Sequence, residues 1–118
     1  MASYRELSVW KKSMDLVEEV YRLIRLLPTE ERFGLSDQMR RAAVSIPSNI
    51  AEGQVRDSNR EFLHFLRIAQ GSRAELDTQL EITVRLGYLS NEQLFPAKQL
   101  CDEIGRMLRT MIRTIEAK

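Results

Sequence analysis

The side chains best suited to hold a metal are Glu61 and His64, which stand three residues apart in a stretch with helical spacing. A Glu-x-x-His pair presents both groups on one face of a helix, and di-iron helical bundles combine two such pairs with two further glutamates. This chain has one histidine, so one subunit cannot supply the second pair. We therefore predict no metal site, and a metal-binding bundle at Glu61 and His64 remains the second alternative function.

The only cysteine, Cys101, is the one candidate for a thiol nucleophile. Such a nucleophile requires a nearby base or cation and access to solvent. Cys101 lies instead in an apolar row with steps of three and four residues, which predicts burial. The sequence also lacks a G-x-S-x-G turn, a Walker loop and a G-x-G-x-x-G loop. We expect no catalytic residue, no cofactor and no small-molecule substrate, hence a protein that is not an enzyme.

Five polar side chains form a row with steps of four, four, three and four residues, which places them on one helix face. This polar row consists of Arg41, Ser45, Asn49, Glu52 and Arg56. Two interpretations are open: an ordinary solvated surface, or a hydrogen-bonded network, buried or between subunits, that fixes one assembly. The short side chains of Ser45 and Asn49 favour the network, because solvated helix faces usually carry longer residues. Its partners are expected on the next helix among Gln70, Ser72, Glu75 and Gln79.

Arginine is the main cation of the chain, and a guanidinium pairs well with phosphate. Five arginines make residues 40–67 locally basic: Arg40, Arg41, Arg56, Arg60 and Arg67. The net charge of the whole chain is only +1, so attraction to nucleic acid would require an assembly that gathers these side chains. Direct nucleic-acid binding through this arginine-rich surface is therefore the first alternative function. Three more arginines share a face near the C-terminus of the last helix, where they complement its dipole: Arg106, Arg109 and Arg113.

Helices must position all of these groups, and the apolar spacing predicts four of them. They are expected over residues 7–26, 36–55, 58–86 and 90–115. Pro28 ends the first, because proline disfavours helix in the residue before it. Ser36 is expected as the N-cap of the second, and Gly87 ends the third. Two capping boxes mark the remaining starts, Ser58 with Glu61 and Ser90 with Gln93.

Two residues interrupt the helical pattern and predict local geometry. Pro47 removes one backbone hydrogen bond inside the second helix, so we expect a kink there, with the helix continuing beyond it. Gly71, near the middle of the third helix, predicts a close approach of a neighbouring helix. Because the connections are short, helices adjacent in sequence should pack antiparallel. We therefore predict one all-α domain over residues 1–118, an up-down antiparallel four-helix bundle with helix 2 kinked at Pro47.

The last helix carries more apolar surface than one bundle interior requires. Its heptad row comprises Leu94, Ala97, Cys101, Ile104, Leu108, Met111 and Ile115. A second row beside it comprises Leu100, Met107 and Ile112. Because a lone bundle cannot cover both rows, we expect copies of the chain to associate. The N-terminal segment lacks an apolar signal core, and no apolar run reaches the ~18 residues of a membrane span, which favours a cytoplasmic protein without membrane contact.

Short motifs along the chain resemble those of one small bacterial family. They include WK at 10–11, FGL at 33–35, QMRRAA at 38–43, SI at 45–46, NIAEG at 49–53, EF at 61–62, FL at 65–66, AQGS at 69–72, EL at 75–76 and LGYL at 86–89. The family comprises four-helix bundle proteins named after open reading frames within intervening sequences of 23S ribosomal RNA. The resemblance covers the chain from about residue 4 to residue 115.

This resemblance implies a left-handed up-down bundle that assembles into a ring, commonly a pentamer. Accessory proteins of diversity-generating retroelements are similar, and their basic ring surface is associated with nucleic acid and a reverse transcriptase. The near-neutral charge of the present chain sets it apart from that type. What the resemblance implies is therefore a non-enzymatic homopentamer that acts as a scaffold or adaptor, with RNA or a nucleic-acid-processing protein as its partner.

Overall fold

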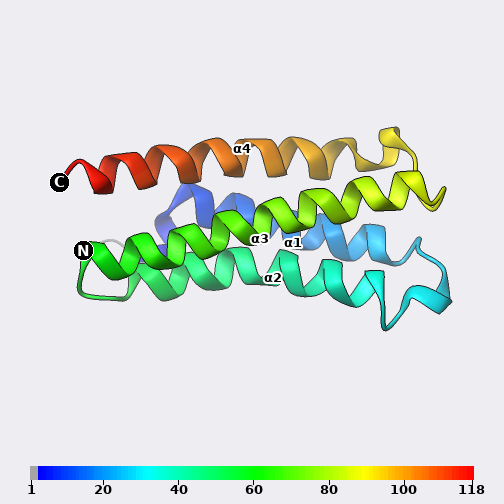
Figure 1. The fold of residues 1–118 in the computed structure, drawn as a ribbon, viewed down its shortest axis with the longest axis horizontal. Helices are drawn as coiled ribbons and strands as arrows, with labels where there is room; N and C mark the ends of the chain where they lie inside the picture. Colours follow the sequence, from blue (N-terminus) through cyan, green and yellow to red (C-terminus); the bar gives the residue numbers. More distant parts are fainter. Residues whose placement is uncertain (1–2) are drawn as a thin grey trace.

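The computed structural model describes residues 3–118, and their fold is all-α (Figure 1). Four helices make up the bundle: α1 (Ser8–Ile24), α2 (Leu35–Gln54), α3 (Asn59–Arg85) and α4 (Asn91–Glu116). Two short 3-10 turns precede α1 and α2: η1 (Tyr4–Glu6) and η2 (Thr29–Glu31). Within the described range there is no strand. The predicted fold class and the four helical ranges are confirmed to within a few residues.

The helices form an antiparallel bundle in which α1 and α3 run one way and α2 and α4 the other (Figure 1). Each helix packs against its neighbour in sequence, and α1 packs against α4, which closes the bundle. Across the described part of the chain, no Cα atom of α1 lies within 8 Å of one in α3, and the same holds for α2 and α4, so these pairs face each other diagonally across the core. The molecule is an elongated block of 46 × 23 × 20 Å, with four outer faces, each formed by two adjacent helices.

The helix starts follow the predicted caps in two cases out of three. Ser90 and Gln93 form the complete capping box that begins α4. Ser58 accepts the Glu61 N–H at 3.0 Å, but the Glu61 carboxylate accepts from the Ser58 hydroxyl and does not bond the Ser58 backbone. The prediction for Ser36 is wrong, because α2 begins one residue earlier and buries that serine. Glu31 caps α2 instead, by accepting the Leu35 N–H at 3.1 Å.

Pro47 lies inside α2, and the helix runs through it as one continuous element. The Pro47 side chain is buried, although the residue cannot donate the backbone hydrogen bond of a regular helix. The structure thus excludes a break at Pro47, and it does not confirm the predicted kink.

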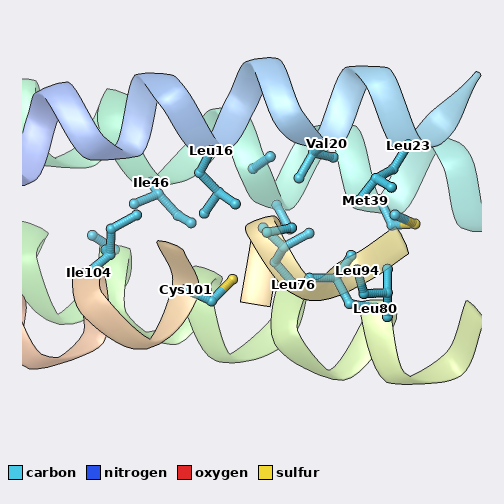
Figure 2. Close-up of a cluster of buried hydrophobic side chains, with 14 of the residues drawn as sticks. Leu16, Val20, Leu23, Met39, Ile46, Leu76, Leu80, Leu94, Cys101 and Ile104 are labelled. Atoms are coloured by element: carbon cyan, nitrogen blue, oxygen red, sulfur yellow. The ribbon is translucent and has the colours of Figure 1, made fainter. Parts of the chain in front are cut away.

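The bundle interior is filled by aliphatic side chains from all four helices. Figure 2 shows residues of every helix pointing into one shared core: Leu16, Val20, Leu23, Met39, Ile46, Leu76, Leu80, Leu94, Cys101 and Ile104. The heptad row of α4 is buried from Leu94 to Leu108, as predicted, while Met111 and Ile115 are half-buried. The reason is visible in Figure 1, where the last turns of α4 extend beyond the start of α1.

Helices approach most closely at glycines other than the predicted one. Gly71 is exposed, and a Cβ placed there would meet nothing within 4 Å, so the predicted contact at this residue is wrong. A Cβ at Gly53 would lie 2.8 Å from Phe65 Cβ and 2.9 Å from Phe62 Cδ1. The close approach of α2 to α3 therefore occurs at Gly53, at one end of the bundle. Gly87 follows α3 with a positive φ of 76°, in agreement with its predicted role.

At the opposite end, a hydrogen bond joins the two inter-helix loops. The Tyr88 hydroxyl donates to Glu31 Oε2 at 2.8 Å, while Glu31 Oε1 caps α2. The bond from the Leu35 backbone, followed by the bond from Tyr88, lowers the pKa of Glu31 below its ordinary value of 4.5. A carboxylate with a lowered pKa stabilises the fold at neutral pH, and this contribution is lost as acid protonates it.

We expect Tyr88→Phe to lower the melting temperature at neutral pH, because it removes one hydrogen bond to the Glu31 carboxylate. The difference from wild type should shrink as the pH falls from about 6 to about 3, since Glu31 becomes protonated in both proteins. Thermal unfolding followed by circular dichroism at several pH values measures it. A constant difference across this range would show that the Glu31 charge is not involved.

Candidate functional site

The residues considered for metal or thiol chemistry do not form a site. His64 is exposed and packs edge-on against Phe65, with ring centroids 5.1 Å apart, and Glu61 is engaged at the α3 cap. Among residues 3–118, no group of three or more His, Cys, Asp and Glu side chains could hold a metal ion. Cys101 is fully buried, and burial raises the pKa of its thiol to about 12. A thiol in that state is protonated and inaccessible at neutral pH.

The polar row on α2 divides into a packed centre and exposed ends. Ser45 Oγ and Ser72 Oγ share a hydrogen bond of 2.8 Å that joins α2 to α3. Asn49 Nδ2 donates to the Ser45 carbonyl at 2.8 Å and to Ser45 Oγ at 2.9 Å. Ser72, one of the four expected partners, thus links the two helices. This centre is a network within one subunit, and its contribution to assembly remains a prediction.

At the ends of the polar row, the charged residues form ion pairs in solvent. Arg56 Nη2 donates to Glu52 Oε2 at 2.7 Å, and Arg41 Nε donates to Asp37 Oδ2 at 3.0 Å. Arg41 is 80% exposed, so its pair adds little to stability. The interpretation as a solvated surface therefore holds for these ends.

Of the other expected partners, Gln70 joins α3 to α4 instead of α2. Its Nε2 donates to the Gly105 carbonyl at 3.0 Å, and its Oε1 accepts from Arg73 Nε at 2.7 Å. Arg73 passes over Gly105, where an added Cβ would lie 2.9 Å from Arg73 Nε. Gln79 is buried, and its Oε1 has no hydrogen-bond partner in the described structure. These two residues belong to the bundle interior and its α3–α4 seam.

The five arginines predicted to face nucleic acid are not gathered on one surface, and four of them approach carboxylates of their own subunit. Besides Arg41 and Arg56, Arg67 pairs with Glu116, and Arg40 Nη1 lies 3.7 Å from Asp37 Oδ1. Within residues 3–118, four of the arginines considered for phosphate binding or for the α4 dipole have no carboxylate within ion-pair distance: Arg60, Arg106, Arg109 and Arg113. Because α3 begins where α4 ends, these four lie toward the same end of the bundle. They overlap the predicted set only at Arg60.

An apolar groove with a volume of about 380 Å³ lies between α1 and α2. Its lining comprises Tyr4, Trp10, Met14, Val17, Val44, Pro47, Ser48 and Ala51. Met14 and Val44 are 40% and 39% exposed, and Tyr21, one turn beyond Val17, is 39% exposed. This groove is an apolar face of the kind that marks an interaction site.

The apolar spacing of residues 7–26 predicted a helix, but it did not show which apolar side chains of that helix would stay exposed. Trp10, Met14, Val17 and Tyr21 have the spacing of a core row, but they line or border the groove. The core row of α1 is shifted by one residue: Val9, Ser13, Leu16, Val20 and Leu23. The presence of two apolar rows side by side on one short helix was the available signal for a second contact surface.

No helix formed by residues 3–118 is long and apolar enough to cross a membrane. Residues 5–110 match the family described as 23S rRNA-intervening sequence protein. A crystal structure of a protein with unknown function, from the S23 ribosomal protein family of Bacteroides thetaiotaomicron VPI-5482, is similar with a TM-score of 0.82. The two chains are 30% identical over 88% of this chain and 97% of that one, and no curated protein matches the sequence. Because the family match spans most of its length, this chain belongs to the 23S rRNA-intervening sequence protein family.

Proposed function

We propose that this protein is a non-enzymatic subunit of a homo-oligomeric ring that acts in the cytoplasm as a scaffold or adaptor associated with RNA. The observation that carries the proposal is the apolar groove between α1 and α2, whose Trp10, Met14 and Val44 gain from being covered. The family resemblance supports a ring, and it favours a pentamer. Glu61 is engaged at the start of α3 and Cys101 is buried in the core, which supports a role without catalysis.

Native mass in solution tests the assembly. A subunit of 13.7 kDa that forms a pentamer should elute as one species of five times this mass in size-exclusion chromatography with light scattering. The mass should stay constant on dilution through the micromolar range if the interface has standard size. A stable monomer at micromolar concentration would overturn the proposal.

The second candidate function is direct binding of RNA, and the arginines without carboxylate partners favour it. Arg109 and Arg113 lie one turn apart on α4, beside the end of the bundle that also carries Arg60. Phosphate binding would make affinity fall steeply with added salt. In a filter-binding titration, the double variant Arg109→Gln with Arg113→Gln should then bind RNA more weakly than wild type. The variant Arg22→Gln should change RNA affinity little, because the Arg22 guanidinium already pairs with Glu19. No binding of wild type at low salt would exclude this function.

A further inference from the structure

We propose that the α1–α2 groove of one copy receives the outer ridge of α3 from the next copy, with Glu75 of that ridge meeting Arg40 at the end of the groove. This inference rests on the proposed homo-oligomer and names the surface that forms it. It follows from the shape of the groove, from the state of Arg40, and from a matching ridge elsewhere on the same chain.

The groove has the shape of a helix-binding site. On α1 its wall carries Trp10, Met14 and Val17, and Tyr21 continues this row with steps of four, three and four residues. On α2 the opposite wall carries Val44, Ser48 and Ala51, and Val55 continues the same steps. Two antiparallel walls with this spacing form the holes into which the side chains of a third helix fit. The occupant is therefore expected to be a helix with an apolar stripe.

Arg40 adds a charge requirement to this apolar groove. It lies one turn before Val44 on the same face of α2, and one third of its side chain is exposed. Its Nη1 is buried and has no hydrogen-bond partner among the described residues. Asp37 Oδ1 lies 3.7 Å away, too far for a hydrogen bond, and the other Asp37 oxygen accepts from Arg41. Because Nη1 is enclosed within its own subunit, a carboxylate from the occupant would pair with the exposed third of the Arg40 side chain.

The outer ridge of α3 has the matching features. Ile68, Glu75 and Ile82 are separated by seven residues each and share one face, and both isoleucines are 38% exposed. Gly71 and Thr78 lie between them and are exposed, and the space around Gly71 is open. Small residues at these positions let another backbone approach closely. Glu75 is exposed, and within residues 3–118 it forms no ion pair.

A second copy is therefore the occupant that the chain itself provides. The ridge and the groove lie on different faces of the subunit. The groove of each copy would therefore bind the ridge of the next copy, and its own ridge would enter the groove of the copy before it, which is a heterologous contact. The groove and the helix that carries the ridge are both next to α2, because α2 packs against α1 and against α3. A heterologous contact forms a closed ring when the rotation between successive copies closes, which is the condition that the proposed ring requires.

Charge reversal tests this pairing in the full-length protein. Arg40→Glu and Glu75→Arg should each place two like charges at every interface and weaken assembly by about tenfold or more. The double variant, Arg40→Glu with Glu75→Arg, should recover most of the wild-type mass, because each interface regains an opposite-charge pair. Arg109→Glu, which changes the net charge as Arg40→Glu does, should leave the mass unchanged. Light scattering over a dilution series measures all four variants.

Gly71→Leu provides a second test that does not depend on charge. The new side chain enters open space in the subunit and should leave its helical circular dichroism unchanged, but it fills the position where the next copy would approach. Dissociation of Gly71→Leu together with recovery in the double charge variant would support the interface. If wild type assembles and these variants keep its mass, or if the double variant fails to recover, this interface is wrong while the proposed oligomer stands. A monomeric wild type would overturn the proposed function itself.

Discussion

Gly53→Ala should destabilise the bundle, although alanine is the better helix former. The new Cβ would lie 2.8 Å from Phe65 Cβ and 2.9 Å from Phe62 Cδ1. Phe65 Cβ is fixed to the α3 backbone, so the two helices must separate to admit the methyl group. Such overpacking costs about 1–3 kcal/mol, which exceeds the gain of about 1 kcal/mol from replacing glycine within a helix. Thermal and urea unfolding should both show the loss.

The matched control is Gly71→Ala in α3. Within its own subunit a Cβ at Gly71 meets nothing within 4 Å, so the helix-propensity gain of up to about 1 kcal/mol should appear undiminished at concentrations where the subunits are dissociated. Both substitutions replace glycine by alanine within a helix. Because the packing around the two sites differs, the change in the free energy of unfolding is expected to have opposite signs. Equal increases in stability for both variants would contradict the close contact of α2 with α3 at Gly53. If the oligomer contributes to stability, the comparison should be made at one fixed subunit concentration.

Leu76→Ala should give a large loss of stability. Leu76 lies at the centre of the bundle with no exposed surface, among core residues contributed by all four helices (Figure 2). Removing its side chain loses the transfer free energy and leaves a cavity, which together cost about 2–5 kcal/mol. Urea unfolding monitored by circular dichroism should show a lower midpoint with little change in slope.

Leu26→Ala is the control for that experiment. Leu26 follows α1 and is 49% exposed, so its truncation should cost well under half as much. Because both variants delete the same atoms, the difference between their losses in the free energy of unfolding reflects the difference in burial of the two leucines. Similar losses at both positions would contradict the described core.

The sequence contained enough information to predict the four helices and their antiparallel order. Local signals were sufficient where a few adjacent residues determine the geometry, as at the Ser90 capping box and at Gly87 after α3. The start of α2 was misplaced because its cap comes from Glu31, a long side chain reaching forward from a separate 3-10 turn. A short serine beside a helical pattern looks like the better cap unless that turn is known.

The contact surfaces were harder to predict, because they depend on how helices face one another. Val9 and Trp10 are adjacent in the sequence, as are Ser13 and Met14, and only the packed bundle shows that Val9 and Ser13 are buried while Met14 is 40% exposed. Glycine in a helix likewise indicates a close approach without identifying which glycine makes it, as the contrast between Gly53 and Gly71 demonstrates. The arginines expected to act together are mostly paired with carboxylates that lie one helix turn away or on another helix.

The sealed position of Cys101 makes the protein convenient for fluorescence experiments. Because the chain has one cysteine and its thiol is enclosed by the core, maleimide dyes should not react with Cys101 in the folded protein. A cysteine introduced at an exposed position such as Thr110 would then carry a dye at one defined place. Donor-labelled and acceptor-labelled preparations could be mixed, and energy transfer would follow the exchange of subunits in real time.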